Sequence, residues 1–178
     1  MNATNTRNRF PSSLSSVNLQ ACERYCVFQY GDGCFGVLAT TVREVALRPK
    51  VSVVPGAGSM LVGLCHLRNE FLPVVQLRDG VFDVNSSAQK QQVVVVSAAG
   101  GSWALLVDRV IGLVPLEVSL SSEGNSAMGW SSSVMGSASH DDKIVQVLDA
   151  NALFRYFDAS LSQGWQANNA SQETLVTS

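Results

Sequence analysis

The side chains best suited to chemistry in this chain are its cysteines and histidines. Cys22, Cys26, Cys34 and Cys65 all lie in the first half of the sequence, and His66 directly follows the last of them. A thiol hydrogen-bonded to an imidazole is the pair that activates a cysteine nucleophile. Residues 65 and 66 are expected in a strand, where neighbouring side chains point to opposite faces, so this pair is not expected to form.

Metal binding is the second chemistry that these residues suggest. Four thiolates can hold zinc, but the sequence has no C-x-x-C pair and the intervals between the cysteines are irregular. We therefore expect reduced cysteines in strands, buried or half-buried. Asp141 and Asp142, next to His140, could hold a cation, although adjacent acids in a loop are more typical of solvated surface.

Motifs for catalysis are missing from the sequence. It contains no nucleophile elbow, no phosphate-binding loop and no paired Glu/His metal motif. We therefore predict no catalytic residues, no metal and no cofactor. A cysteine-dependent metal-binding protein or enzyme stays as the alternative from another class.

A hairpin with an arginine at its tip is predicted over residues 61–77. Two apolar runs flank Arg68-Asn69, and Asn69 can close a two-residue turn because asparagine tolerates positive φ. The planar fork of donors on Arg68 suits a carboxylate or a backbone carbonyl on a partner. A second role stays open, in which Arg68 covers apolar surface with its stem or braces a neighbouring loop.

Composition narrows the classes of partner. The chain has 178 residues, about one domain, and is 46% hydrophobic but only 15% charged, which favours a compact protein with an apolar surface and a protein partner. A net charge of -2 and a pI near 5.6 argue against binding to nucleic acid or anionic membranes. No apolar run approaches the roughly 20 residues that span a bilayer, and no secretory signal is recognisable, so we expect a cytoplasmic location.

The elements that would position these residues are mostly short strands. We predict a disordered leader over 1–20, one domain over 21–158 whose halves meet in a polar crossing near 78–92, and a flexible tail over 159–178. One helical turn is expected at 41–45, and a closing helix is expected from an Asp149 cap through Phe157. Strands are expected at 25–30, 34–39, 47–54, 61–67, 71–77, 93–96, 102–107, 110–114, 134–138 and 143–148. The predicted fold class is all-β with a C-terminal helix.

The central hairpin resembles the G-x-x-x-L-R-G-x-x-x-P-V-x-D-L core of CheW-like domains, the adaptor modules of bacterial chemosensory arrays. The chain departs from this pattern at three positions: His66 replaces Asn, Asn69 replaces Gly, and Gln76 replaces Asp. Shorter matches occur to V-x-E-I at 42–45, to L-V-D-x-V at 106–110 and to I-x-L-D-x-x-x-L-F near the end, so the resemblance covers about 24–157. The core is matched by Gly63, Leu67, Arg68, Pro73, Val74 and Leu77.

The resemblance implies a fold and a function. The fold would be two intertwined five-stranded SH3-like β-barrels, with the terminal elements crossing to the opposite half. The protein would couple the signalling tip of chemoreceptors to the regulatory domain of a CheA-type histidine kinase. It would be a monomer on its own and assemble in arrays, with no nucleic-acid partner and no membrane insertion. A scaffold of a pilus-motility or other chemosensory-like array is the alternative. The implied receptor- and kinase-binding residues are Val42, Glu44, Val45, Arg68 and Asn69.

Overall fold

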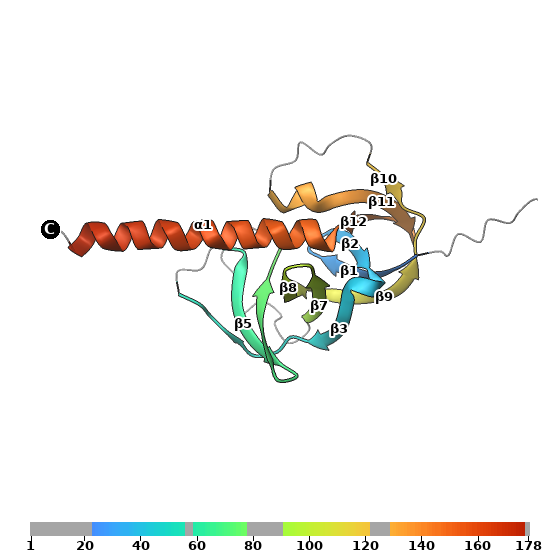
Figure 1. The fold of residues 1–178 in the computed structure, drawn as a ribbon. Coiled ribbons are helices and arrows are strands. Elements are labelled where there is room, and N and C mark those ends of the chain that lie inside the picture. Colours follow the sequence, from blue (N-terminus) through green and yellow to red (C-terminus); the bar gives the residue numbers. More distant parts are fainter. Residues whose placement is uncertain (1–22, 56–58, 78–90, 122–128, 177–178) are drawn as a thin grey trace, which may run out of the picture.

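The computed structural model describes residues 23–55, 59–77, 91–121 and 129–176, with side chains through Gln163. The leader predicted over 1–20, Cys22 and nearly all of the predicted crossing at 78–92 lie outside these residues. Twelve strands, two short 3-10 helices and one α-helix make up the described part, which confirms a mainly β fold with a C-terminal helix (Figure 1).

The bounds of most elements follow the predicted strands closely, but the strand predicted at 47–54 is an exception. The strands are β1 (Arg24–Tyr30), β2 (Gly33–Leu38), β3 (Val42–Leu47), β4 (Val51–Ser52), β5 (Leu61–Leu67), β6 (Glu70–Val75), β7 (Gln92–Ala98), β8 (Gly101–Val107), β9 (Arg109–Pro115), β10 (Ser119–Leu120), β11 (Val134–His140) and β12 (Lys143–Leu148). The helices are η1 (Ala39–Thr41), η3 (Gly129–Ser133) and α1 (Ala150–Val176).

The strands form two sheets of six. The first sheet has the order β10-β11-β12-β2-β1-β9, and the second has the order β3-β7-β8-β6-β5-β4. Five strands were expected in each half. The sixth strand of each sheet is only two residues long. It is β10 in the first sheet, where it pairs with β11, and β4 in the second sheet, where it pairs with β5.

The two sheets repeat one arrangement, and each sheet contains the first hairpin of the other half of the chain. Strands β1–β6 and β7–β12 are two copies of the same pattern, because replacing each strand of one sheet by the strand six places along the chain reproduces the other sheet. Each sheet has one parallel pair among the recorded pairings. In the first sheet β12 pairs with β2, and in the second sheet β6 pairs with β8. The β1–β2 hairpin therefore belongs to the sheet of β9–β12, which confirms the predicted intertwining.

The core explains why the valine run of β7 is apolar on both faces. Val94 and Val96 enter a large cluster that joins both sheets to α1, whereas Val93 and Val95 face a second cluster inside their own sheet. All four side chains are fully buried, as predicted. A third cluster lies inside the first sheet, around Val27.

The closing helix begins where the sequence predicts. The Oδ1 atom of Asp149 accepts hydrogen bonds from the backbone N–H groups of Asn151 (2.8 Å) and Ala152 (3.0 Å), which is the geometry of an N-cap. Leu153 and Phe157 are buried, and the Phe157 ring packs at 5.4 Å against that of Trp103. In the described ranges, no helix combines the length and the apolar content needed to cross a lipid bilayer.

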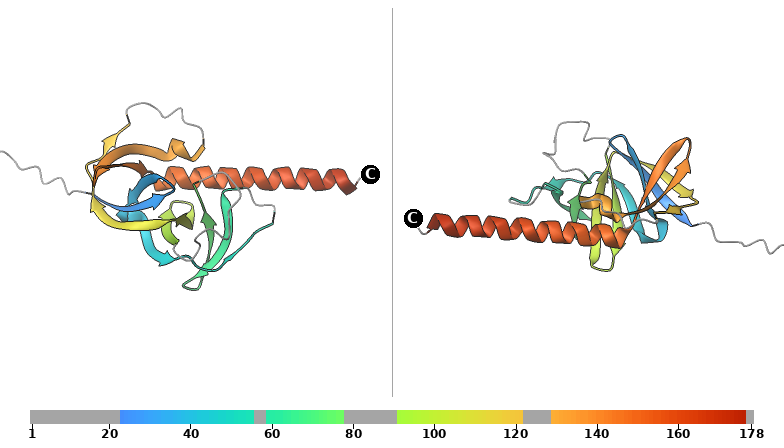
Figure 2. Two further views of the ribbon diagram at one scale, coloured as in Figure 1. Left: turned by 180° about the vertical axis from the view of Figure 1, so that it is seen from behind. Right: turned by 90° about the horizontal axis from the view of Figure 1, so that it is seen from above.

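Three predicted elements differ from the structure. The strand predicted at 47–54 is reduced to β4, since Pro49 has no N–H to donate and interrupts the run. The helix does not end at Phe157 but continues to Val176, through the expected tail, and projects as a rod beyond both sheets (Figures 1 and 2). The residues after Phe157 include no proline and a single glycine, Gly164, so little in the sequence stops the helix. The helical turn expected at 41–45 is instead the start of β3, because its valines pair with those of β7.

Burial of Cys26 is expected to make the stability of the fold sensitive to alkaline pH. Removal from water raises the pKa of this thiol from its ordinary value of 9.0 to about 11. Between these values the unfolded chain loses the thiol proton and the native chain keeps it, so the free energy of unfolding decreases as the pH rises. We expect a loss of about 2 to 3 kcal/mol by pH 11, measured by urea unfolding from pH 8 upwards. Cys26→Ala provides the control, and an equal pH dependence in both proteins would contradict this role for the thiol.

Candidate protein-binding site

The tip of the β5–β6 hairpin is a two-residue turn in the left-handed region. Arg68 has φ 46° and Asn69 has φ 71°, as a turn of the primed type requires. Leu67 and Glu70 pair across the turn, so both turn residues project beyond the strands. The predicted turn is confirmed. The equivalent turn of the other sheet, Asp141-Asp142, has the same two positive φ angles but carries acids in place of arginine.

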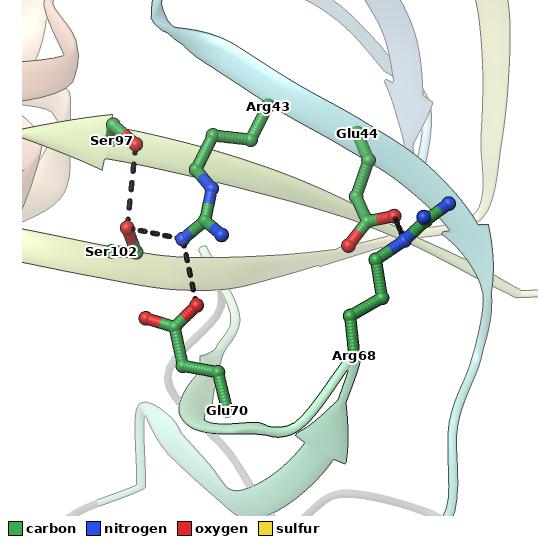
Figure 3. Close-up of polar contacts among 6 residues, drawn as sticks. All are labelled: Arg43, Glu44, Arg68, Glu70, Ser97 and Ser102. Carbon is green, nitrogen blue, oxygen red and sulfur yellow. Dashed lines mark hydrogen bonds and ion pairs between the residues drawn. The ribbon is translucent and has the colours of Figure 1, made fainter.

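Arg68 is joined to β3 by an ion pair. Its Nε donates to Oε2 of Glu44, and the Arg68 side chain is 79% exposed whereas that of Glu44 is only 17% exposed (Figure 3). The two residues are 24 positions apart in the chain and on different strands. Arg68 therefore braces β3, a strand that is not next to its own hairpin in the sheet, while most of its surface stays in contact with solvent.

A second ion pair lies beside the first. Nη1 of Arg43 donates to Oε2 of Glu70 at 2.8 Å and to the Ser102 hydroxyl at 2.8 Å. The Ser102 hydroxyl lies 3.3 Å from that of Ser97, across the β7–β8 hairpin (Figure 3). We call Arg43, Glu44, Arg68 and Glu70 the hairpin corner. Its two ion pairs connect the β5–β6 hairpin to β3. In the order of the sheet, β7 and β8 lie between β3 and β6.

A bulge in β3 allows two consecutive residues to reach the same hairpin. Val42 pairs with Val96 and Glu44 with Val95, so Arg43 is an extra residue without a partner opposite it. Neighbouring side chains of a regular strand point to opposite faces, but a bulge turns the extra side chain away from its normal direction. Arg43 and Glu44 therefore both face the hairpin (Figure 3).

The structure brings together three of the five site residues predicted from the resemblance. Glu44, Arg68 and Asn69 lie in or next to the hairpin corner. Val42 is partly buried against the shared core, so little of it faces outward. Val45 is 40% exposed on β3. Sequence reasoning missed Arg43 and Glu70, although an arginine followed closely by a glutamate in both segments, Arg43-Glu44 and Arg68-x-Glu70, was a signal for the two pairs.

The departures from the family motif have structural explanations at two positions. His66 is exposed, and its ring lies 4.9 Å from that of Phe71 on the neighbouring strand. Gln76 is buried, and its Nε2 donates to the Ser59 carbonyl at 2.9 Å. Gln76 thus satisfies a backbone acceptor in the loop before β5, which a carboxylate could not do.

The cysteines lie away from this site. Cys65 is buried while His66 is exposed, in agreement with the predicted opposite faces. Burial raises the pKa of Cys26, Cys34 and Cys65, which keeps these thiols protonated and weakly nucleophilic. Across the described parts of the chain, no three His, Cys, Asp or Glu side chains are grouped so that they could hold a metal ion.

The chain is similar to a known protein family in sequence and to a solved structure in fold. A model of the family described as "CheW-like domain" matches residues 24–157, the range that the sequence motifs delimit. The fold is similar to that of the scaffolding protein TtCheW from Thermoanaerobacter tengcongensis, with a TM-score of 0.62 and 21% sequence identity, covering 74% of this chain and 92% of that chain. No curated protein matches the sequence.

Proposed function

The chain belongs to the CheW-like domain family, and we propose that it is an adaptor that couples chemoreceptors to a CheA-type histidine kinase. It binds the cytoplasmic signalling tip of the receptors and the regulatory domain of the kinase, and it catalyses no reaction itself. It is a monomer alone and joins these partners in cytoplasmic arrays. A change in the state of the receptor would then be transmitted to the kinase through protein–protein contacts alone.

The observation that carries this proposal is the hairpin corner. The ion pair between Nε of Arg68 and the Glu44 carboxylate holds the arginine in place, and yet the Arg68 side chain is 79% exposed. A charged group that is already held in place loses less conformational freedom when it binds, so a fixed arginine favours recognition of a partner. The bulge of β3 and the rigid two-residue turn provide this fixed position.

Exposed apolar side chains on β3, the strand that carries Arg43 and Glu44, support the same conclusion. On β3, Val45 is 40% exposed and Leu47 is 72% exposed. Apolar side chains next to charged ones are the usual arrangement of a protein interface, in which the apolar groups are buried and the charged groups form the rim. We place the receptor on the exposed surface of β3, with Val45 as the apolar contact and Arg68 and Asn69 at the rim.

Val45→Asp tests this assignment. The wild-type chain should bind a receptor signalling-tip fragment and a kinase regulatory domain from the same bacterium, measured by titration calorimetry. Val45→Asp should weaken receptor binding about tenfold, because it places a charge in a buried contact. Ile144→Asp is the matched control, since Ile144 is an exposed β-branched residue, 71% exposed, on the other sheet. A wild-type chain that binds neither protein would refute the function, whereas equal effects of the two variants would refute the placement on β3.

A further inference from the structure

A groove opens on the first sheet where β10 ends beside β11 (Figure 1). Strand β10 pairs only with Ser137 and Gly136, so among the described residues no strand lies on that side of residues 138–140. Three consecutive residues of β11, from Ser137 to Ser139, line a groove of about 640 Å³ together with Glu117, and we call it the β11 groove. Successive side chains of a strand point to opposite faces, so a groove that contacts three residues in a row runs along the edge of the strand. The backbone groups of this edge are open to another extended segment.

The equivalent groove of the second sheet carries the opposite charge. Its lining includes Lys50, which takes the place that Glu117 has in the β11 groove. Each of these two residues lies two positions before a residue that pairs with the hairpin strand, β5 or β11. The turns of the two hairpins differ in the same way, since one is Arg68-Asn69 and the other is Asp141-Asp142. Lys143, which follows the acidic turn, offsets only one of the three acids. The β11 groove therefore favours a cationic occupant.

The segment before β1 joins the sheet beside this groove and is cationic. Leu116, between two residues of the lining, donates its N–H to the Glu23 carbonyl at 3.3 Å. The predicted leader, residues 1–20, contains Arg7 and Arg9 and no acidic residue. In an extended segment these two side chains lie on one face. The residues from Arg9 to Glu23 can reach over roughly 45 Å when extended, so the arginines can return to the groove.

We propose that residues 7–10 of the same chain occupy the β11 groove as an added strand, with Arg7 and Arg9 facing Glu117 and the acidic turn. Main-chain hydrogen bonds to the open edge would provide affinity, and the charges select this groove over its equivalent on the second sheet. A tethered segment has an effective concentration on the order of millimolar, so weak contacts are sufficient. The contact orders part of the leader and covers an edge that could otherwise pair with another chain. This inference goes beyond the proposed function and does not depend on it.

Charge reversal in the full chain tests this contact. The backbone amide signals of residues 138–140 and their hydrogen exchange are followed by NMR in the ¹⁵N-labelled chain at low ionic strength. In Arg7→Glu/Arg9→Glu these signals should shift, and their exchange should become about threefold faster. Glu117→Lys should have the same effect, and adding it to the leader variant should restore slow exchange. Lys50→Glu, the matched change in the equivalent groove, should have no effect. Glu117 and Lys50 are both exposed, so neither change should disturb the fold.

The outcomes separate the possible occupants of the groove. Signals and exchange rates at 138–140 that are the same in the wild type and in the leader variant would overturn the proposal. Equal effects of Glu117→Lys and Lys50→Glu would overturn the choice of the β11 groove. Protection that increases with protein concentration would mean that the groove holds the leader of a second copy, and it would overturn the contact within one chain.

Discussion

Replacing Gly63 by alanine is expected to destabilise the fold by about 4 kcal/mol and to lower the melting temperature by about 10 °C. A Cβ atom at this position would lie 2.3 Å from the carbonyl oxygen of Ser52 and 2.7 Å from a methyl group of Val51. Gly63 also has φ +149°, a conformation that side chains rarely adopt. Strand β4 can pair closely with β5 only because Gly63 has no side chain. Thermal unfolding followed by circular dichroism measures the effect.

Gly112→Ala is the matched control for this prediction. Gly112 has a similar φ of +156°, but a Cβ atom there would meet nothing within 4 Å. Its substitution should therefore cost only the backbone strain, about 1 to 2 kcal/mol. If both variants lost the same stability, the close approach of β4 would contribute nothing. Gly136 resembles Gly63, since its Cβ would lie 2.5 Å from the Ser119 carbonyl of β10, as expected if the two sheets repeat one design.

Local patterns were sufficient to predict most elements of this fold. The four consecutive valines of β7, the Arg68-Asn69 turn and the Asp149 cap each depend on a few neighbouring residues, and each is present in the structure. The exchange of hairpins between the two sheets depends on parallel pairs between strands far apart in the chain, such as β12 with β2. Periodicity carries no information on such pairs, so the intertwining came from the family resemblance alone.

The hairpin corner could be predicted only in part. Arg68 is identified by its place in a two-residue turn, which is a local property. Its pairing with Glu44, and that of Arg43 with Glu70, depend on a bulge and on the curvature of the sheet, which bring together residues 24 and 27 positions apart. The length of α1 was underestimated for a different reason. Polarity predicts a flexible tail after residue 158, but the same residues include few that oppose a helix.

Arg68→Glu should weaken partner binding at least thirtyfold, or about 2 kcal/mol, if Arg68 contacts the partner. The same change places a carboxylate against Glu44, whose side chain is only 17% exposed, so we also expect a loss of about 1 kcal/mol in stability. The single variant therefore mixes the two roles of Arg68, the brace on β3 and the contact with a partner. Lys143→Glu makes the same change in net charge at the equivalent hairpin of the other sheet and should leave binding unchanged.

The double variant Glu44→Arg/Arg68→Glu separates the two roles. It restores an ion pair of reversed order between β3 and the hairpin, so its free energy of unfolding should return to within about 0.5 kcal/mol of the wild-type value. Binding should stay weak, because a partner carboxylate would now meet the exposed glutamate at the tip of the hairpin. Recovery of both stability and binding in the double variant would instead mean that Arg68 acts only as a brace. Urea unfolding and calorimetric titration with the receptor fragment, on the same preparations, decide between the two results.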